Sequence, residues 1–307
     1  LLDSYGHDYD AFSLTRSEGS SVSAARELVF RSHGLRTRIL DWGAKVVVTR
    51  NPTGVLAAVC TNAQSVFDTD DGRSAGIHYW LARPFADVIT SSAFDPEAHG
   101  RSLQRYRAIK AQMFLHPRYF QFNPEVLKRY RLTGDRLFVA RFSAYSAAHD
   151  RSARGLSSEM RRVVVERLSA AGNLVQSTEG EGLRVFRNGG SEVEALTAPE
   201  AFHHVLAAAE LYVGDSQSVA GEAGVLGTPT IHYSSFAKKL FYLSLLQKHG
   251  LVQCFSPTEE GEFFKALADA LHAGPELRTR TERAAWTFNS EAEDLPQWYR
   301  NLIRNML

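Results

Sequence analysis

The sequence predicts an α/β protein built from two halves, each a mainly parallel sheet with helices on both faces. Its 307 residues suit two domains. In both halves, short and continuously apolar segments alternate with helical patterns, which is typical of parallel strands buried on both faces. A hydrophobic content of 44% with 22% charged residues is ordinary for a chain that buries full cores.

The first half contains strand patterns separated by helices. A helix is predicted from Ser21 or Ser23 to Gly34, where the glycine would end it. The three valines within Lys45–Thr49 predict a buried strand because β-branched residues favour strands. The other predicted elements are a helix over 55–62, a strand over 65–67, a helix over 78–86 and a strand over 87–90.

Residues 108–131 form a predicted connector to the second half, since Pro117 and Pro124 interrupt any regular element there. Strands are then predicted over 137–142, 173–177, 212–213 and 251–255, and helices over 157–170, 199–209, 219–226, 237–249 and 259–272. A helical tail over 278–307 is broken near Pro296. The predicted domains are an N-terminal domain over 1–115, a C-terminal domain over 116–280, and helices over 281–307 that return to the first domain.

Charge and cysteine content narrow the function classes. The formal net charge of +1 gives no general attraction to nucleic acid or to a membrane, and no apolar run reaches transmembrane length. Cys60 and Cys254 both lie in apolar runs and are expected to be buried free thiols, which suits a cytoplasmic protein. The opening Leu1–Gly6 is typical of a helix end, so the N-terminal domain is expected to be incomplete.

The most informative segment is Val213–Tyr233, with the sequence VGDSQSVAGEAGVLGTPTIHY. It predicts a strand, a polar turn, a short helix stopped by Gly227, and a second buried strand. Backbone N–H groups of the turn, at Gly214, Ser216, Gln217 and Ser218, would bind a phosphate at the helix N-terminus, helped by the two serine hydroxyls. Glu222 is placed to reach a ribose diol, and the small residues of the helix would let another backbone or a ligand approach closely. An ordinary β-α-β unit with a tightly packed helix explains the segment equally well.

The loop after the predicted strand over 137–142 carries a second group of polar residues. Arg141 is a candidate phosphate ligand, Ser143 lies two residues further on, and His149 beside Asp150 is a candidate acid–base pair. The alternative is a surface salt bridge for Arg141 and a loop-capping role for His149. A metal site is the weaker interpretation, because no third ligand is suitably spaced.

Three carboxylates, Asp68, Asp70 and Asp71, follow the predicted strand over 65–67. Close carboxylates repel one another unless they are bound, hydrogen bonded or hydrated. At the carboxyl end of a parallel strand they would orient acceptor hydroxyls, bind a divalent metal or take a catalytic proton, and Asp70 and Asp71 are the candidate catalytic residues. An exposed loop with a helix N-cap is the alternative.

Taken together, the motifs resemble the family called domain of unknown function 354, a relative of GT-B glycosyltransferases and UDP-N-acetylglucosamine 2-epimerases. The resemblance covers most of the chain and rests on KVVVTRNPTG from Lys45, VFDTDD from Val66, LARPFADVITSSAF from Leu81, LHPRYFQFNPEVL from Leu115, RFSAYSAAHD from Arg141 and VGDSQSVAGEAGVLGTPTIHYSSF from Val213. Within the last motif, Glu222 is similar to the ribose-binding glutamate of these relatives.

This resemblance implies a GT-B fold with two Rossmann-like domains facing across a cleft. It also implies a glycosyltransferase that uses a nucleotide-diphosphate sugar, such as a UDP-sugar, as donor substrate on the C-terminal domain and a glycan or lipid-linked acceptor on the N-terminal domain. Neither a permanently bound cofactor nor a metal is expected, nucleic acid is not an expected partner, and peripheral membrane association stays open. Such an enzyme would serve polysaccharide biosynthesis.

Two alternatives remain at this point. One is a sugar-nucleotide 2-epimerase, in which Asp68, Asp70, Asp71 and His149 would move the proton, although the chain lacks the epimerase-like His-x-Glu-Ala-Gly-Leu-Arg stretch. The other is a non-catalytic nucleotide-sugar-binding protein. The sequence leaves the oligomeric state open.

Overall fold

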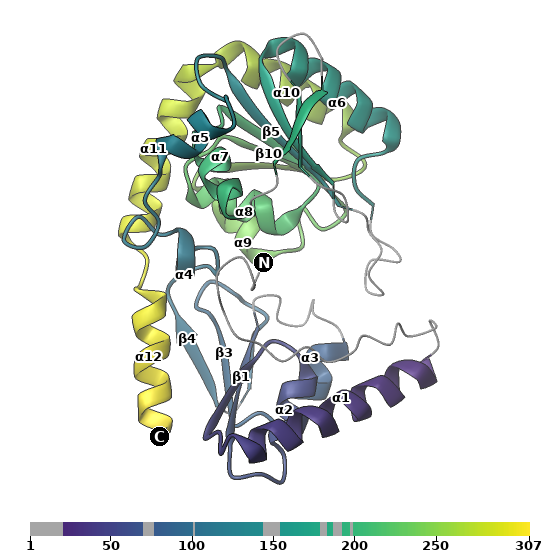
Figure 1. Cartoon of the computed structure of the whole chain (residues 1–307), viewed down its shortest axis with the longest axis vertical. Coiled ribbons are helices and arrows are strands. Elements are labelled where there is room, and N and C mark those ends of the chain that lie inside the picture. The colour runs from purple at the N-terminus through teal and green to yellow at the C-terminus, as the bar shows by residue number, and fades with distance from the viewer. Residues whose placement is uncertain are drawn as a thin grey trace. The chain divides into compact units, whose positions relative to one another are not determined.

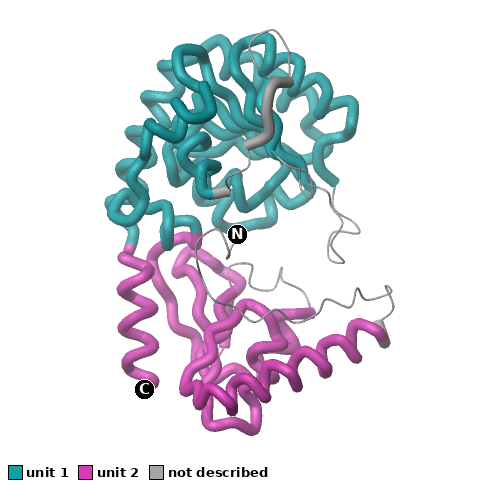
Figure 2. The backbone as a smooth tube through the Cα atoms, viewed as in Figure 1, with its two compact units in different colours: residues 1, 3–5, 111–292 teal, residues 2, 6–110, 293–307 magenta. Residues whose placement is uncertain are grey.

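The computed structural model describes residues 21–69, 77–100, 102–143, 154–178, 183–186, 192–196 and 199–307. The described chain forms two compact units (Figure 2). The C-terminal unit comprises Ala111–Ala292, and the N-terminal unit comprises the described residues from Ser21 to Lys110 together with Glu293–Leu307. The candidate catalytic residues Asp70, Asp71 and His149 lie outside the described residues.

In the described part of the N-terminal unit, a four-stranded parallel sheet of order β1-β2-β3-β4 forms the centre (Figure 1). Its strands are β1 (Val46–Thr49), β2 (Gln64–Asp68), β3 (Val88–Ser92) and β4 (Leu103–Tyr106). Its helices are α1 (Ser21–Asp41), α2 (Pro52–Ala58), α3 (Ile77–Ala82) and α12 (Leu295–Met306).

Alternation along the strands gives this sheet two different faces. Phe67 and Ile89 are paired in register and pack with Val55 of α2 and Tyr79 of α3. The next register pair, Asp68 and Thr90, therefore lies on the opposite face, which α12 covers. One face is thus an apolar core, whereas the other carries buried polar groups.

The sheet of the C-terminal unit has seven strands among the residues that the structure describes, in the order β11-β10-β9-β5-β6-β7-β8. Its strands are β5 (Leu137–Phe142), β6 (Asn173–Thr178), β7 (Leu183–Phe186), β8 (Glu192–Leu196), β9 (Leu211–Gly214), β10 (Thr230–Tyr233) and β11 (Val252–Phe255). Its helices are α4 (Gln112–Leu115), α5 (Pro124–Arg129), α6 (Ser158–Ala171), the 3-10 helix η4 (Pro199–Ala201), α7 (Phe202–Ala208), α8 (Gln217–Val225), α9 (Phe241–Lys248), α10 (Glu260–Ala273) and α11 (Pro275–Ser290).

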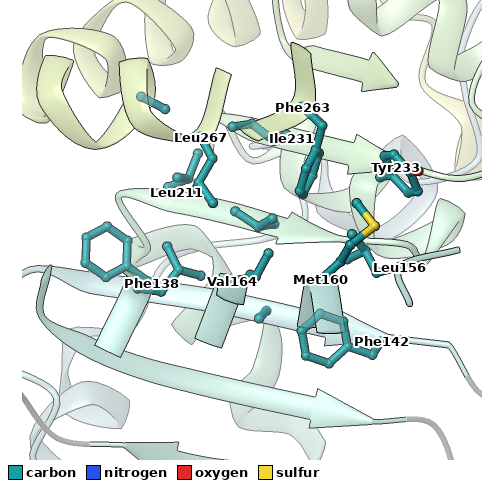
Figure 3. Close-up of a cluster of buried hydrophobic side chains, with 14 of the residues drawn as sticks. Phe138, Phe142, Leu156, Met160, Val164, Leu211, Ile231, Tyr233, Phe263 and Leu267 are labelled. Carbon is teal, nitrogen blue, oxygen red and sulfur yellow. The ribbon is translucent and has the colours of Figure 1, made fainter. Parts of the chain in front are cut away.

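A large apolar cluster of this unit lies between the sheet and helices α6 and α10 (Figure 3). Phe138 and Phe142 of β5 pack in it with Val164 of α6, and Ile231 of β10 packs in it with Phe263 of α10. Helices α7, α8 and α9 pack against the strands from the other side (Figure 1). The unit is therefore a doubly wound α/β domain.

The strand order also locates the point where ligands bind in such domains. The chain runs outward from β5 to β6 and later returns to place β9 on the other side of β5. In open α/β sheets, ligands bind beyond the carboxyl ends of the strands at such a switch point. That point lies between Phe142 at the end of β5 and Gly214 at the end of β9.

Several local predictions were wrong. Helix α1 continues through Gly34 to Asp41, because Leu35 and Ile39 beyond the glycine pack against the second helix. The valine strand β1 lies at the edge of the described sheet and leaves Val48 exposed. Strands β4, β7 and β8 were not predicted. Cys60 is exposed rather than buried, whereas Cys254 is a buried free thiol as expected.

Candidate functional site

The turn between β9 and α8 forms an N–H cradle at the switch point. Ser216 is the N-cap residue in an extended conformation, and its hydroxyl makes no capping hydrogen bond. The Ala220 N–H donates to the Ser216 carbonyl at 3.0 Å and closes the first helical turn. The N–H groups of Gln217, Ser218 and Val219 precede this bond, so they are the donors that a helix leaves for an anion.

Gly214 is required because β9 passes very close to β5 at this level. A Cβ atom on Gly214 would lie 2.2 Å from the Arg141 carbonyl oxygen and 2.7 Å from the Tyr212 hydroxyl. Real carbon atoms do not approach that closely, so only glycine fits. The glycine therefore sets the strand spacing beneath the cradle.

The other small residues of α8 serve packing rather than ligand access. A Cβ on Gly221 would lie 3.3 Å from Tyr242, and a Cβ on Gly224 would lie 3.1 Å from Val252. The expected close approach at these two positions is made by side chains of α9 and β11, which leave no room for a ligand there. Gly227 does end the helix as predicted, with φ of +77° and a Schellman pair of hydrogen bonds.

Asp215 follows Gly214, and its fully buried carboxylate binds the backbone on both sides of the 144–153 segment. The Ser143 N–H donates to Oδ1 at 2.6 Å, and the Leu156 N–H donates to Oδ2 at 3.0 Å. Ser143 and Leu156 are thirteen positions apart in the sequence, and the shared carboxylate holds their N–H groups close together. The predicted ligand residue Ser143 thus has its N–H occupied by the protein.

Arg161 of α6 completes this arrangement, which we call the Asp215 clamp (Asp215, Ser143, Leu156 and Arg161). Its guanidinium donates to Asp215 at 3.1 Å and to the carbonyls of Ser143 and Leu156, each at 2.9 Å. Burial raises the pKa of Asp215, while the Ser143 N–H and the Arg161 charge oppose that shift. The clamp rigidifies the carboxyl end of β5 next to the cradle.

Arg141 lies half-buried near the end of β5, in register with Gly214 on one side and Ser177 on the other. Its guanidinium donates to the Ser177 hydroxyl. Residues in register on parallel strands share a face, and the face of Arg141 is opposite that of Phe142. Arg141 therefore lies on the side of the sheet that carries α8, where the predicted role in phosphate binding stays a prediction.

His232 of β10 continues the same register row beyond Gly214. The imidazole is wholly buried, and its Nε2 lies 2.9 Å from the Ser234 hydroxyl. Burial lowers the pKa of His232 to about 4, although the Gly214 carbonyl acts in the opposite direction. The histidine is therefore neutral in the folded protein near pH 7.

Glu222 occupies the face of α8 that also carries Ser218, four residues earlier. Its side chain is 18% exposed and its Oε2 lies 3.2 Å from Nε2 of His203 on α7. Ser218 itself is exposed. The rise of a helix places Glu222 about 9 Å beyond the N-cap, so the least buried face of α8 combines anion donors with a carboxylate.

In the N-terminal unit, Asp68 lies in a buried polar network at the end of β2 and is only 5% exposed. Its Oδ1 accepts from the Tyr299 hydroxyl at 2.6 Å and from the Thr90 hydroxyl at 3.1 Å, and its Oδ2 pairs with Lys110. The Nε atom of Arg50 lies 3.9 Å from Oδ2 of Asp68. We call Asp68, Thr90, Tyr299 and Lys110 the Asp68 network; it joins α12 to the sheet.

No group of three or more candidate metal ligands occurs among the described residues. None of the described helices combines the length and the apolar character needed to cross a membrane. Three residues beside the candidate cradle that sequence analysis did not select as site residues are Asp215, Arg161 and His203. Asp215 lies within the predicted polar turn of the segment singled out above, and His203 has no local signal because its partner lies on another helix.

Sequence searches find neither a matching family model nor a matching curated protein, so the resemblance to domain of unknown function 354 stays a prediction. Solved structures do match. MnaA from S. aureus with UDP matches at TM-score 0.60 and 12% identity over 100% of this chain and 86% of that chain. UDP-GlcNAc 2-epimerase from Neisseria meningitidis bound to UDP-GlcNAc matches at TM-score 0.57 and 10% identity, over 99% of this chain and 86% of that chain.

A third match is WaaG, described as a glycosyltransferase involved in lipopolysaccharide biosynthesis, with TM-score 0.54 and 12% identity over 96% of this chain and 86% of that chain. At these identities the matches establish the fold alone. Both units are Rossmann-like α/β domains with parallel strands at their centres. The predicted fold class is confirmed: this chain has the GT-B fold.

Proposed function

We propose that this protein is a GT-B glycosyltransferase that uses a nucleotide-diphosphate sugar as donor, with UDP as the nucleotide. The observation that carries the proposal is the least buried face of α8. Free N–H donors at Gln217 and Ser218 begin this face, and the half-buried carboxylate of Glu222 follows. A diphosphate suits the helix N-terminus, and a ribose diol suits a carboxylate acceptor.

In this proposal the leaving diphosphate is stabilised by the cradle and by the α8 dipole. Arg141 and the hydroxyls of Ser143 and Ser216 supply further contacts to the donor. Asp70, Asp71 and His149 keep their predicted roles in proton transfer and acceptor orientation. The acceptor is a glycan or a lipid-linked sugar.

A UDP-sugar 2-epimerase is the second candidate, because UDP-GlcNAc 2-epimerases are among the structures that match this fold over almost the whole chain. Both candidates bind a UDP-sugar, and they differ in the product. Incubation with UDP-sugars separates them: a sugar joined to an acceptor indicates the transferase, whereas an epimer or free sugar without acceptor indicates the epimerase.

The nucleotide site is tested by calorimetric titration with UDP. Ser218→Pro removes a cradle N–H at a first-turn position where helices tolerate proline, so UDP binding should be lost while the fold is kept. Ser218→Ala keeps the N–H and loses only the hydroxyl, so as the matched control it should weaken UDP binding far less than Ser218→Pro does. Equal binding by the proline variant and the control would contradict the proposed cradle.

A further inference from the structure

Glu222 is the one residue of the segment from Val219 to Val225 that is not buried. Among the described residues, His203 is the one side chain within hydrogen-bond distance of its carboxylate. A carboxylate has acceptor capacity for about four hydrogen bonds. The contact with His203 therefore leaves most of this capacity for a ligand.

His203 is itself held by aromatic neighbours. Its ring centroid lies 5.6 Å from that of Phe114 and 6.0 Å from that of Phe202. Since an ionised carboxylate only accepts hydrogen bonds, the Nε2 atom that faces Glu222 must carry the proton. A packed ring thus presents a fixed N–H donor to the carboxylate.

The next residue, His204, provides a contrast on the same helix. Its Nδ1 accepts from the Asn123 N–H at 3.1 Å, and its ring stacks on Phe120 with centroids 4.9 Å apart. His204 therefore joins α7 to the chain before α5, and nothing in its contacts involves Glu222. Two adjacent histidines have separate partners: a backbone N–H for one and a carboxylate for the other.

We propose that His203 is a positioning residue that orients the Glu222 carboxylate for the 2′ and 3′ hydroxyls of a ribonucleoside diphosphate. This inference rests on the proposed function, since it assigns the origin of ribose specificity within that same site. A free glutamate side chain on α8 would sample several rotamers, and a fixed N–H on Oε2 selects one of them. Preorganisation of this kind increases affinity by lowering the ordering cost of binding.

The test compares the affinities of UDP and 2′,3′-dideoxy-UDP by calorimetry, because their ratio reports only the contacts of the two hydroxyls. The unsubstituted protein should prefer UDP by at least tenfold, and Glu222→Ala should abolish this preference. His203→Phe keeps an aromatic ring between its neighbours but loses the donor, so the preference should fall at least threefold while dideoxy-UDP affinity stays within twofold. His203→Gln retains a donor and should restore most of the preference.

His204→Ala is the matched control and should leave the preference unchanged. The inference is overturned if His203→Phe keeps the full preference, or if it weakens both ligands equally, which is the result of a purely structural role. If the unsubstituted protein binds neither nucleotide, the proposed function fails as well. If it binds UDP but His203→Phe and His203→Gln behave alike, the inference alone fails.

Discussion

Strand β9 ends just before the buried Asp215, and strand β2 ends at the buried Asp68. The two carboxylates have different hydrogen-bond partners. Asp215 accepts hydrogen bonds from two backbone N–H groups and a guanidinium. Asp68 accepts from side-chain hydroxyls of distant elements and pairs with Lys110. The Asp215 clamp therefore fixes the course of the backbone beside the cradle, whereas the Asp68 network fastens a C-terminal helix to an N-terminal sheet.

This difference suggests different purposes for the same residue type. A carboxylate that accepts hydrogen bonds from backbone N–H groups fixes the position of that backbone, which here lies next to the candidate ligand site. A carboxylate bound by hydroxyls and a lysine holds together segments that are far apart in sequence: Tyr299 is 231 residues from Asp68. We expect substitutions in the first network to affect both stability and nucleotide affinity, and substitutions in the second to affect mainly the docking of α12.

The largest expected effect is that of Asp215→Ala. Removing one partner of a buried ion pair leaves Arg161 and two backbone N–H groups without their acceptor, so the free energy of unfolding should fall by about 3–5 kcal/mol. Urea denaturation followed by circular dichroism measures this change. Glu159→Ala removes an exposed ion pair with Arg162 on the same helix as Arg161. Similar urea midpoints for Asp215→Ala and Glu159→Ala would contradict a stabilising role of the Asp215 clamp.

A pH titration tests the same region through His232. Its pKa is about 4 in the folded protein and 6.5 ordinarily, so the unfolded chain binds more protons between these values. Stability should therefore fall as the pH decreases from 6.5 to 4, by at most about 3 kcal/mol from this residue. His232→Asn should make the pH dependence of urea unfolding shallower. Parallel profiles for the two proteins would argue against a neutral buried histidine.

Tyr299→Phe tests the Asp68 network. The hydroxyl donates to a buried carboxylate at 2.6 Å, and burial followed by the Asp68 charge raises its pKa, which keeps it protonated. Loss of this hydrogen bond should cost about 1.5–3 kcal/mol. A double-mutant cycle with Asp68→Asn should show coupling, whereas a cycle with Asp215→Ala should be additive. A coupling energy between Tyr299 and Asp215 would show that the Asp68 network and the Asp215 clamp are not independent.

The smallest expected effect concerns the glycine before Asp215. A methyl group on Gly214 overlaps the Arg141 carbonyl, so Gly214→Ala should force β9 away from β5 and cost about 1–3 kcal/mol. Gly261→Ala on α10 is the matched control, because its new methyl group meets nothing within 4 Å. Thermal unfolding should show a loss for the first and none for the second. Equal melting temperatures would mean that the strand spacing is not critical.

Much of the fold followed from local patterns. The alternation of apolar strands and helices predicted the doubly wound units, and Gly227 predicted the end of α8 because a glycine there adopts positive φ. Gly34 failed as a stop signal, since a glycine keeps helical geometry at a cost of about 1 kcal/mol when residues beyond it are buried. The hairpin strands β7 and β8 were missed because short strands with mixed polarity have weak signals.

The sequence by itself determined the turn and helix of Val213–Tyr233, and with them the candidate cradle, because capping, helix ends and strand patterns depend on neighbours along the chain. Only the tertiary structure decided which groups those elements meet. Asp215 finds Ser143 and Arg161 at separations of 72 and 54 residues, and Glu222 meets His203 across two helices. Such contacts depend on strand order and helix packing, which local propensity does not encode.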